Sequence, residues 1–295
     1  MSDTNNVIIF GGDSFTWGEG LELYLNSPKW VNEKNNLNGW SQLYQKQDYE
    51  SKSFRESNRF PTLVANHFNV NPRLSPKNGG QMETPIYLIE RNLHNSVGYQ
   101  PNNVKCIIFQ FTTLDRCLLH LDMDCKCNFC KLTGFEKPFN LYIKFLQSKV
   151  YNTPLSDVDY YALKFLNKTE NLPMDVDLDT VFKNINKFFK PLYIRNLNTL
   201  IEKYVKKWEK IAPVYFIDSW EENSSNVIRE IPYITNRLIP LEGYNGKSYI
   251  KYSEWENTFP HTRIRDEFPD TFNGHPTLIQ HQYIAKSIIK YLNGK

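Results

Sequence analysis

Short apolar runs bounded by turn residues mark the strands that this chain is expected to form. Residues 6–10 are mostly apolar and close on Gly11 and Gly12, the pattern of a buried strand that ends in a tight turn. None of the apolar runs approaches the roughly 20 residues that a membrane-spanning helix needs. The same criterion predicts further strands at residues 70–74, 104–111 and 213–217, with residues 237–241 as an edge strand.

Apolar residues at intervals of three and four predict helices between these strands. One helix begins at Pro61 and runs to Phe68, and residues 184–208 and 276–292 repeat the pattern over longer stretches. Strands that alternate with helices indicate βα units, which build a mainly parallel sheet with helices on both faces. We interpret residues 1–295 as a single α/β domain without internal repeats.

Composition and charge narrow the classes of function. A hydrophobic content of 40% and a charged content of 23% fit a folded globular chain. Thirty-five Lys and Arg against 32 Asp and Glu leave a formal net charge of +3. Because the two signs alternate along the chain, we expect no nucleic-acid partner. The polar first six residues lack the features of a secretion signal, so we expect a cytoplasmic protein without a membrane partner.

Candidate chemistry begins directly after the first expected strand. Ligands of parallel sheets bind at the carboxyl ends of the strands, and here the chain reads Gly-Gly-Asp-Ser-Phe-Thr-Trp-Gly over residues 11–18. A serine on such a turn, Ser14, is placed to attack a carbonyl, and its own N–H is placed to help hold the oxyanion. The alternative is a plain strand-to-helix turn in which Asp13 or Ser14 caps a helix.

At these residues the sequence resembles the SGNH/GDSL hydrolase family, whose nucleophile block is a Gly-Asp-Ser after the first strand. The resemblance implies a three-layer α/β/α sandwich with a flavodoxin-like sheet, and hydrolysis of esters without a cofactor. Together with the Thr-Thr-Leu-Asp-Arg of residues 112–116, the block looks like variants of the family found in bacteriophage genomes. That likeness implies a virion-associated esterase acting on host polysaccharide, alone or in a homo-oligomer.

The resemblance also implies two oxyanion donors besides the nucleophile turn. Family members place a glycine after the second strand, and Gly80, or its neighbour Gly79, holds that position here. Two adjacent glycines are equally typical of a simple turn. The family usually has an Asn after the third strand, where this chain has Thr112. A hydroxyl donates one hydrogen bond and reaches less far than a carboxamide, so the oxyanion hole would be weaker or reshaped.

The general base implied by the resemblance is His275, which precedes the proline that opens the last expected helix. The acid of the family's triad usually stands three residues before the histidine, where this chain has Phe272. Asp270 is our first choice to orient the imidazole, because a carboxylate also stabilises the imidazolium. Asn273 could orient the ring as an amide, and a Ser-His dyad without a strong acid is the third alternative.

The resemblance covers both ends of the chain and leaves the middle unmatched. We interpret residues 117–210 as an insertion that starts with a cysteine-rich loop and continues as helices. Three thiols in Cys-x-Cys-x-x-Cys spacing, with Cys117 or His120 as a fourth ligand, make a candidate structural zinc site. The alternative is a set of reduced thiols, or a pair oxidised outside the cell. The proposed zinc cysteines are Cys117, Cys125, Cys127 and Cys130.

These residues together predict a serine esterase that removes O-acetyl or other short acyl groups from a glycan or a similar small-molecule ester. Two substituted family positions, Thr112 and Phe272, favour a different hypothesis: a non-catalytic protein of the same fold with a structural or glycan-binding role. A third hypothesis is an interaction module organised by zinc. Reaction of Ser14 with a fluorophosphonate separates the first hypothesis from the second.

Overall fold

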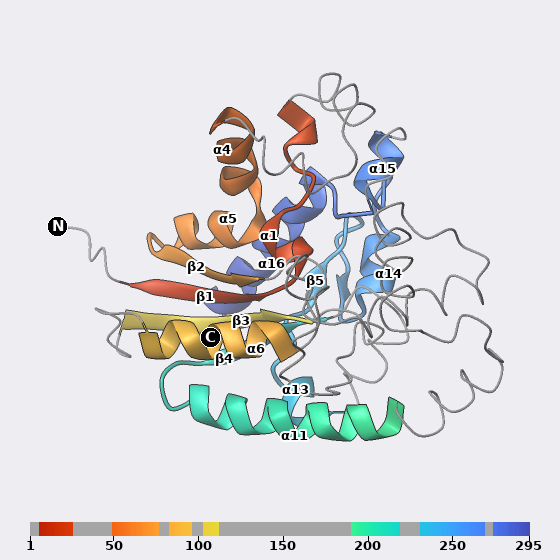
Figure 1. Ribbon diagram of the computed structural model, residues 1–295. Helices are drawn as coiled ribbons and strands as arrows, with labels where there is room; N and C mark the ends of the chain where they lie inside the picture. Colours follow the sequence, from red (N-terminus) through yellow and green to blue (C-terminus); the bar gives the residue numbers. More distant parts are fainter. Residues whose placement is uncertain are drawn as a thin grey trace, which may run out of the picture. The chain divides into compact units, whose positions relative to one another are not determined.

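A parallel sheet of four strands, in the order β2-β1-β3-β4, lies at the centre of the fold (Figure 1). Leu238 adds a single parallel bridge to Phe216 of β4. With Leu238 in the fifth position, the order corresponds to the 2-1-3-4-5 order of flavodoxin-like folds. The predicted α/β class is confirmed. The strands are β1 (Val7–Gly12), β2 (Asn71–Pro76), β3 (Val104–Gln110) and β4 (Val214–Ile217).

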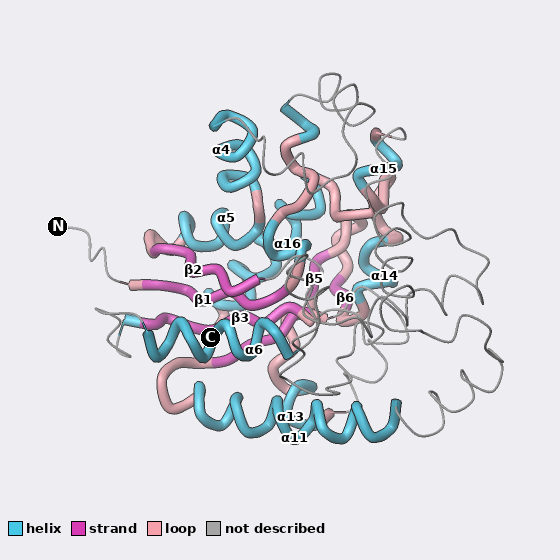
Figure 2. Tube along the Cα trace, in the orientation of Figure 1, coloured by secondary structure: helices cyan, strands magenta, loops and turns pink. Residues whose placement is uncertain are grey.

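The chain divides into two compact units, residues 1–116 with 198–295 and residues 117–197. The predicted insertion over residues 117–210 stays a prediction, although residues 198–210 belong to the same unit as the sheet. The computed structural model, coloured by secondary structure in Figure 2, describes residues 6–25, 49–76, 83–95, 103–111, 190–218, 231–268 and 274–295.

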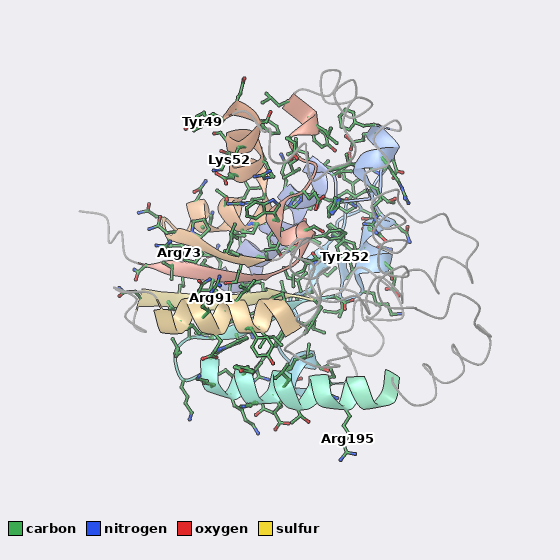
Figure 3. The ribbon with its side chains drawn as sticks, in the orientation of Figure 1. Tyr49, Lys52, Arg73, Arg91, Arg195 and Tyr252 are labelled. Carbon is green, nitrogen blue, oxygen red and sulfur yellow. The ribbon has the colours of Figure 1, made fainter. Side chains whose placement is uncertain are left out.

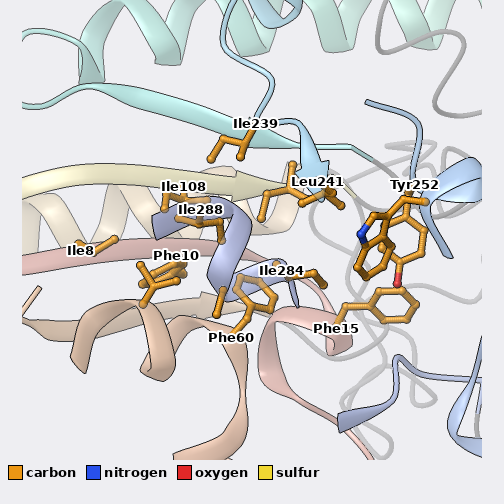
Figure 4. Close-up of a cluster of buried hydrophobic side chains, with 14 of the residues drawn as sticks. Ile8, Phe10, Phe15, Phe60, Ile108, Ile239, Leu241, Tyr252, Ile284 and Ile288 are labelled. Atoms are coloured by element: carbon orange, nitrogen blue, oxygen red, sulfur yellow. The ribbon is translucent and has the colours of Figure 1, made fainter. Parts of the chain in front are cut away.

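Helices cover both faces of the sheet, which explains why all six residues of β1 are buried. Side chains alternate along a strand, so Ile8 and Phe10 face one layer and Ile9 and Gly11 the other. The first layer consists of α5 (Phe60–His67) and α16 (Leu278–Asn293), which pack on the sheet through a shared apolar cluster (Figure 4). This arrangement supplies one side of the three-layer sandwich.

The opposite face of the sheet packs on α6 (Glu83–Asn95) and on the second half of α11 (Lys190–Trp208). Gly11 of β1 lies directly against the side chain of Ile89, so α6 approaches the strand closely. The other side chains of this layer, from α6, β3, β4 and α11, surround a cavity of about 10 Å³: Ile86, Phe109, Ile201, Tyr204, Val205, Trp208 and Phe216.

The segment predicted as an edge strand, residues 237–241, is split between two roles. Its first half pairs with β4 through the isolated Leu238 bridge, and its last residue begins β5 (Leu241–Glu242). β5 pairs antiparallel with β6 (Ser248–Tyr249), away from the parallel sheet. Other helices within the described ranges are α1 (Ser14–Trp17), α4 (Tyr49–Asn58), α13 (Pro232–Thr235), α14 (Tyr252–Glu256) and α15 (Ile264–Glu267).

The longer helices of the described ranges bury one side and expose charged residues on the other. α11 spans 19 residues and ends near the exposed residues Lys206 and Lys207. Within these ranges, no helix combines the length and the apolar character needed to cross a membrane.

Candidate active site

The turn after β1 is built around two glycines and one capping carboxylate. A Cβ at Gly12 would collide with the Thr16 hydroxyl, so only glycine fits between the strand end and α1. Asp13 is the N-cap of α1, and its Oδ1 accepts a hydrogen bond of 2.9 Å from the N–H of Phe15. Gly18 ends the helix with φ of +80°, the left-handed conformation that favours glycine. The capping turn considered from the sequence therefore exists, and it holds Ser14 at the first helical position.

The side chains of Ser14 and His275, 261 positions apart, meet at the carboxyl end of β1. The distance from Ser14 Oγ to His275 Nε2 is 2.8 Å, within hydrogen-bonding range. Ser14 is 2% exposed, and the His275 side chain is 20% exposed. The serine is thus shielded from bulk water while the imidazole stays reachable. A hydroxyl bonded to a ring nitrogen in this way is the arrangement of a nucleophile with its general base.

His275 is held from three sides. Its carbonyl accepts a hydrogen bond of 2.9 Å from the N–H of Ile264, at the start of α15. Its ring meets the ring of Phe15 edge-on, with centroids 5.5 Å apart. Two residues later Thr277 caps α16 through a reciprocal pair of bonds with Gln280, which fixes where the helix begins. The backbone of His275 is therefore fixed beside the start of α16, and Phe15 packs against its ring.

A carboxylate that the sequence did not single out, Glu19, also contacts the reacting nitrogen. Glu19 Oε2 lies 3.4 Å from His275 Nε2, and the Glu19 side chain is 15% exposed. The left-handed turn at Gly18 brings the chain back, and the Glu19 N–H donates to the Ser14 carbonyl at 3.1 Å. The signal available in the sequence was an acidic residue five positions after the serine, but only the turn geometry shows that it reaches the histidine.

Gln110, the last residue of β3, ties the nucleophile turn to the neighbouring strand. Its Oε1 accepts a hydrogen bond of 2.7 Å from the Thr16 hydroxyl, and its amide group donates to the Phe111 carbonyl at 3.2 Å. Gln110 is 5% exposed. Both ends of the carboxamide are used, so the side chain fixes α1 relative to the end of β3. Sequence reasoning overlooked this residue, because it looked for an oxyanion donor two positions later.

An aromatic and ionic wall lies behind Phe15. Arg263 sits over the rings of Phe15 and Tyr252, 5.7 and 5.8 Å from their centroids, and makes an ion pair of 2.5 Å with Glu256. Figure 3 shows Tyr252 at the end of the sheet where the parallel strands finish. Burial raises the pKa of Glu256 to about 7, although the Arg263 charge opposes that shift. The wall supports Phe15, and through it the ring of His275.

A second buried carboxyl, Glu22, lies near the same turn. Burial raises its pKa to about 7, with the nearby Glu19 charge contributing in the same direction and Arg55 opposing it. Arg55 and Arg59 both stack against Trp17, 4.9 and 5.4 Å from the ring. These charged groups surround the far end of α1 and belong to its support.

The sequence-predicted site residues fall into two groups. Ser14 and His275 are brought together. The other catalytic and oxyanion candidates lie outside the described residues, and so do all four cysteines of the predicted zinc site, which stays a prediction. In the ranges that the structure covers, no group of three or more His, Cys, Asp or Glu side chains could hold a metal ion. The candidates outside the described residues are Gly79, Gly80, Thr112, Asp270, Asn273, Cys117, Cys125, Cys127 and Cys130.

Comparisons with known proteins give similarity to solved structures only. No protein-family model matches the chain, and no curated protein matches it. One similar structure is that of a carbohydrate esterase described as having an active site with divergent catalytic and non-catalytic binding functions. It is 14% identical, with a TM-score of 0.45, over 100% of this chain and 67% of that chain. Another is a member of the lipolytic protein G-D-S-L family from Veillonella parvula, 12% identical, with a TM-score of 0.38, over 98% of both chains.

Proposed function

We propose that this chain is a serine esterase in which Ser14 is the nucleophile and His275 the general base. The observation that carries the proposal is the 2.8 Å contact between Ser14 Oγ and His275 Nε2 at the carboxyl end of a parallel sheet. A serine hydroxyl is a weak nucleophile until a base removes its proton, and the contact supplies that base. Ser14 is almost fully buried, so its hydroxyl is held against His275 rather than solvated by bulk water.

The reaction follows from the positions of these two side chains. Ser14 Oγ attacks the acyl carbon while its proton passes to His275 Nε2, giving a tetrahedral intermediate with a negatively charged oxygen. His275 then donates the proton to the departing alcohol oxygen as the carbon–oxygen bond breaks. In the second half of the reaction His275 takes a proton from water, and the resulting hydroxide attacks the acyl carbon. The bond from that carbon to Ser14 Oγ then breaks, the carboxylic acid leaves, and Ser14 Oγ takes the proton back from His275.

The remaining roles are proposed from the sequence. The N–H of Ser14 stands at the first position of α1, where a helix offers no internal acceptor, and we assign it to the oxyanion. Gly80 N–H and the Thr112 hydroxyl are the proposed partner donors. Asp270 or Asn273 is proposed to orient the distal nitrogen of His275. The proposed substrate is an O-acetyl or short acyl ester of a glycan, hydrolysed without a cofactor, and we propose a virion-associated setting.

Labelling with a fluorophosphonate probe tests the proposal. The folded wild-type chain should gain one probe per molecule, detected by intact mass, and should hydrolyse p-nitrophenyl acetate. Ser14→Ala should do neither, whereas replacement of the exposed serine in the matched control Ser248→Ala should leave both unchanged. A folded wild-type chain that neither labels nor turns over the ester would overturn the proposal. That result would favour the alternative, a non-catalytic structural or glycan-binding protein of this fold.

A further inference from the structure

Glu19 and Ser14 both contact His275 Nε2, the nitrogen atom that moves the proton in the proposed reaction. Glu19 Oε2 is 3.4 Å from His275 Nε2, and Ser14 Oγ is 2.8 Å from the same atom. The mechanism uses His275 as acid and base but assigns no task to this carboxylate. The position of Glu19 is fixed by the backbone, because its N–H is bonded to the Ser14 carbonyl after the left-handed turn at Gly18. The backbone of Glu19 is therefore fixed beside the nucleophile turn, and from there its carboxylate reaches His275 Nε2.

The departing alcohol must come to the same place. His275 Nε2 gives its proton to the alcohol oxygen, so that oxygen has to approach the nitrogen within hydrogen-bonding distance, about 3 Å. The alcohol oxygen and Glu19 Oε2 are then both neighbours of one atom. A substituent on the carbon vicinal to the esterified carbon lies within reach of the carboxylate. Glu19 thus borders the alcohol side of the substrate.

The chemistry of a carboxylate limits what it can recognise there. An ionised carboxylate only accepts hydrogen bonds, and it repels other anions. An alkyl or ether group at this position cannot donate a hydrogen bond to the carboxylate, and it would displace part of the water that hydrates the carboxylate. A hydroxyl group at that position would donate to it and replace the lost hydration. Hydrogen bonds to charged groups are among the stronger ones in proteins.

We propose that Glu19 binds a hydroxyl group on the carbon vicinal to the esterified carbon, so that the enzyme selects esters of polyols and sugars that keep a free vicinal hydroxyl. This inference rests on the proposed function and specifies its substrate class. Because the hydroxyl can also move toward the carboxylate as the ester bond breaks, the selection acts on kcat/KM. Alcohols that carry phosphate or carboxylate at the neighbouring carbon are rejected by the same charge.

A matched pair of substrates tests the proposal. 2-Hydroxyethyl acetate and 2-methoxyethyl acetate have the same acyl group and the same ester carbon, and only the first has a donor hydroxyl. The measured quantity is the ratio of their kcat/KM values. The wild type should favour the hydroxyl ester by about 10- to 100-fold, the range of one hydrogen bond to a charged group. In Glu19→Ala the ratio should fall close to one. In Glu19→Gln, which keeps a neutral acceptor, it should fall to an intermediate value.

The controls separate this proposal from the function on which it rests. Glu254→Ala, which removes an exposed carboxylate of α14, should keep the wild-type ratio and rate. An unchanged ratio in both Glu19 variants would overturn the proposal, even where both rates fall, because Glu19 would then act only through His275. Should Glu19→Ala not fold, the isosteric Glu19→Gln alone decides by the same ratio. If the wild type neither hydrolyses the two esters nor reacts with the fluorophosphonate, the result would instead contradict the proposed esterase function.

Discussion

His281 of α16 makes the stability of this protein depend on pH in a direction that can be calculated. The residue is fully buried, its Nδ1 accepts the N–H of Phe60 at 3.3 Å, and its ring stacks on the Phe60 ring with centroids 5.8 Å apart. Burial, aided by the positive charge of Arg59, lowers the pKa of His281 from 6.5 to about 3. Between about pH 3 and pH 6.5, the His281 imidazole is therefore neutral in the folded chain and charged in the unfolded chain.

The sign and size of the effect follow from this difference. Between pH 6.5 and 3 the unfolded chain binds a proton at His281 that the folded chain does not, so the free energy of unfolding falls as the pH falls. The slope approaches 1.4 kcal/mol per pH unit, and the whole interval corresponds to about 5 kcal/mol. Glu22 and Glu256, whose pKa values are raised to about 7, act in the opposite direction, because the folded chain binds their protons more tightly.

Urea unfolding of the wild type and of His281→Asn at pH 7, 6, 5 and 4.5 isolates this contribution. The asparagine oxygen can still accept the Phe60 N–H but does not titrate. We expect the variant to be about 1–2 kcal/mol less stable at pH 7, from lost packing. That deficit should shrink by about 2–3 kcal/mol, and so vanish or reverse, by pH 4.5. The exposed control His261→Asn should run parallel to the wild type. Parallel curves for His281→Asn would refute the reasoning.

Two further substitutions test the packing that positions the site. Gly12→Ala forces its Cβ into the Thr16 hydroxyl. We expect the free energy of unfolding in urea to fall by about 2 kcal/mol or more, and esterase activity to fall at least tenfold. The control Gly294→Ala should lower the free energy of unfolding by less than about 0.5 kcal/mol. Ser287→Ala removes the acceptor of the Glu242 N–H, bonded at 2.8 Å, and should cost about 1–3 kcal/mol with unchanged activity; a neutral result would show that water replaces the hydroxyl.

The sheet and its principal helices could be read from the sequence because their signals are local. Apolar runs closed by turn residues predicted β1, β3 and β4 to within a few residues of their ends. The proline at the start of α5 and the apolar spacing of α16 predicted both helices of one layer. Alternation of strands and helices then implied the parallel sheet, which the observed pairing confirms.

Elements with weak apolar signals escaped prediction. α4 buries only Ser51 and Arg55, so no apolar stripe marks it in the sequence. α6 turns Ile86 and Ile89 toward the sheet, but its proline and many polar residues hide the helical period. In both cases the helix is stabilised by contacts with distant parts of the chain, which a local pattern does not contain.

The candidate site divides in the same way. Ser14 and His275 stand at the ends of predicted elements, and parallel topology brings such ends to one edge. Glu19 reaches the site because the left-handed turn at Gly18 directs it toward His275. Gln110 reaches it because its carboxamide extends to the Thr16 hydroxyl. Nothing in the residue order specifies those directions.

A double-mutant cycle on Ser14 and His275 tests most directly whether the two side chains form one catalytic unit. The measurement is kcat/KM for p-nitrophenyl acetate in the wild type, Ser14→Ala, His275→Ala and the double variant, all shown to fold by circular dichroism. We predict that each single substitution lowers kcat/KM by on the order of 1,000-fold, and that the double variant is no worse than either, because removing one partner already disables the other. Independent losses that multiply in the double variant, or a His275→Ala protein that keeps most of the wild-type activity, would contradict the account.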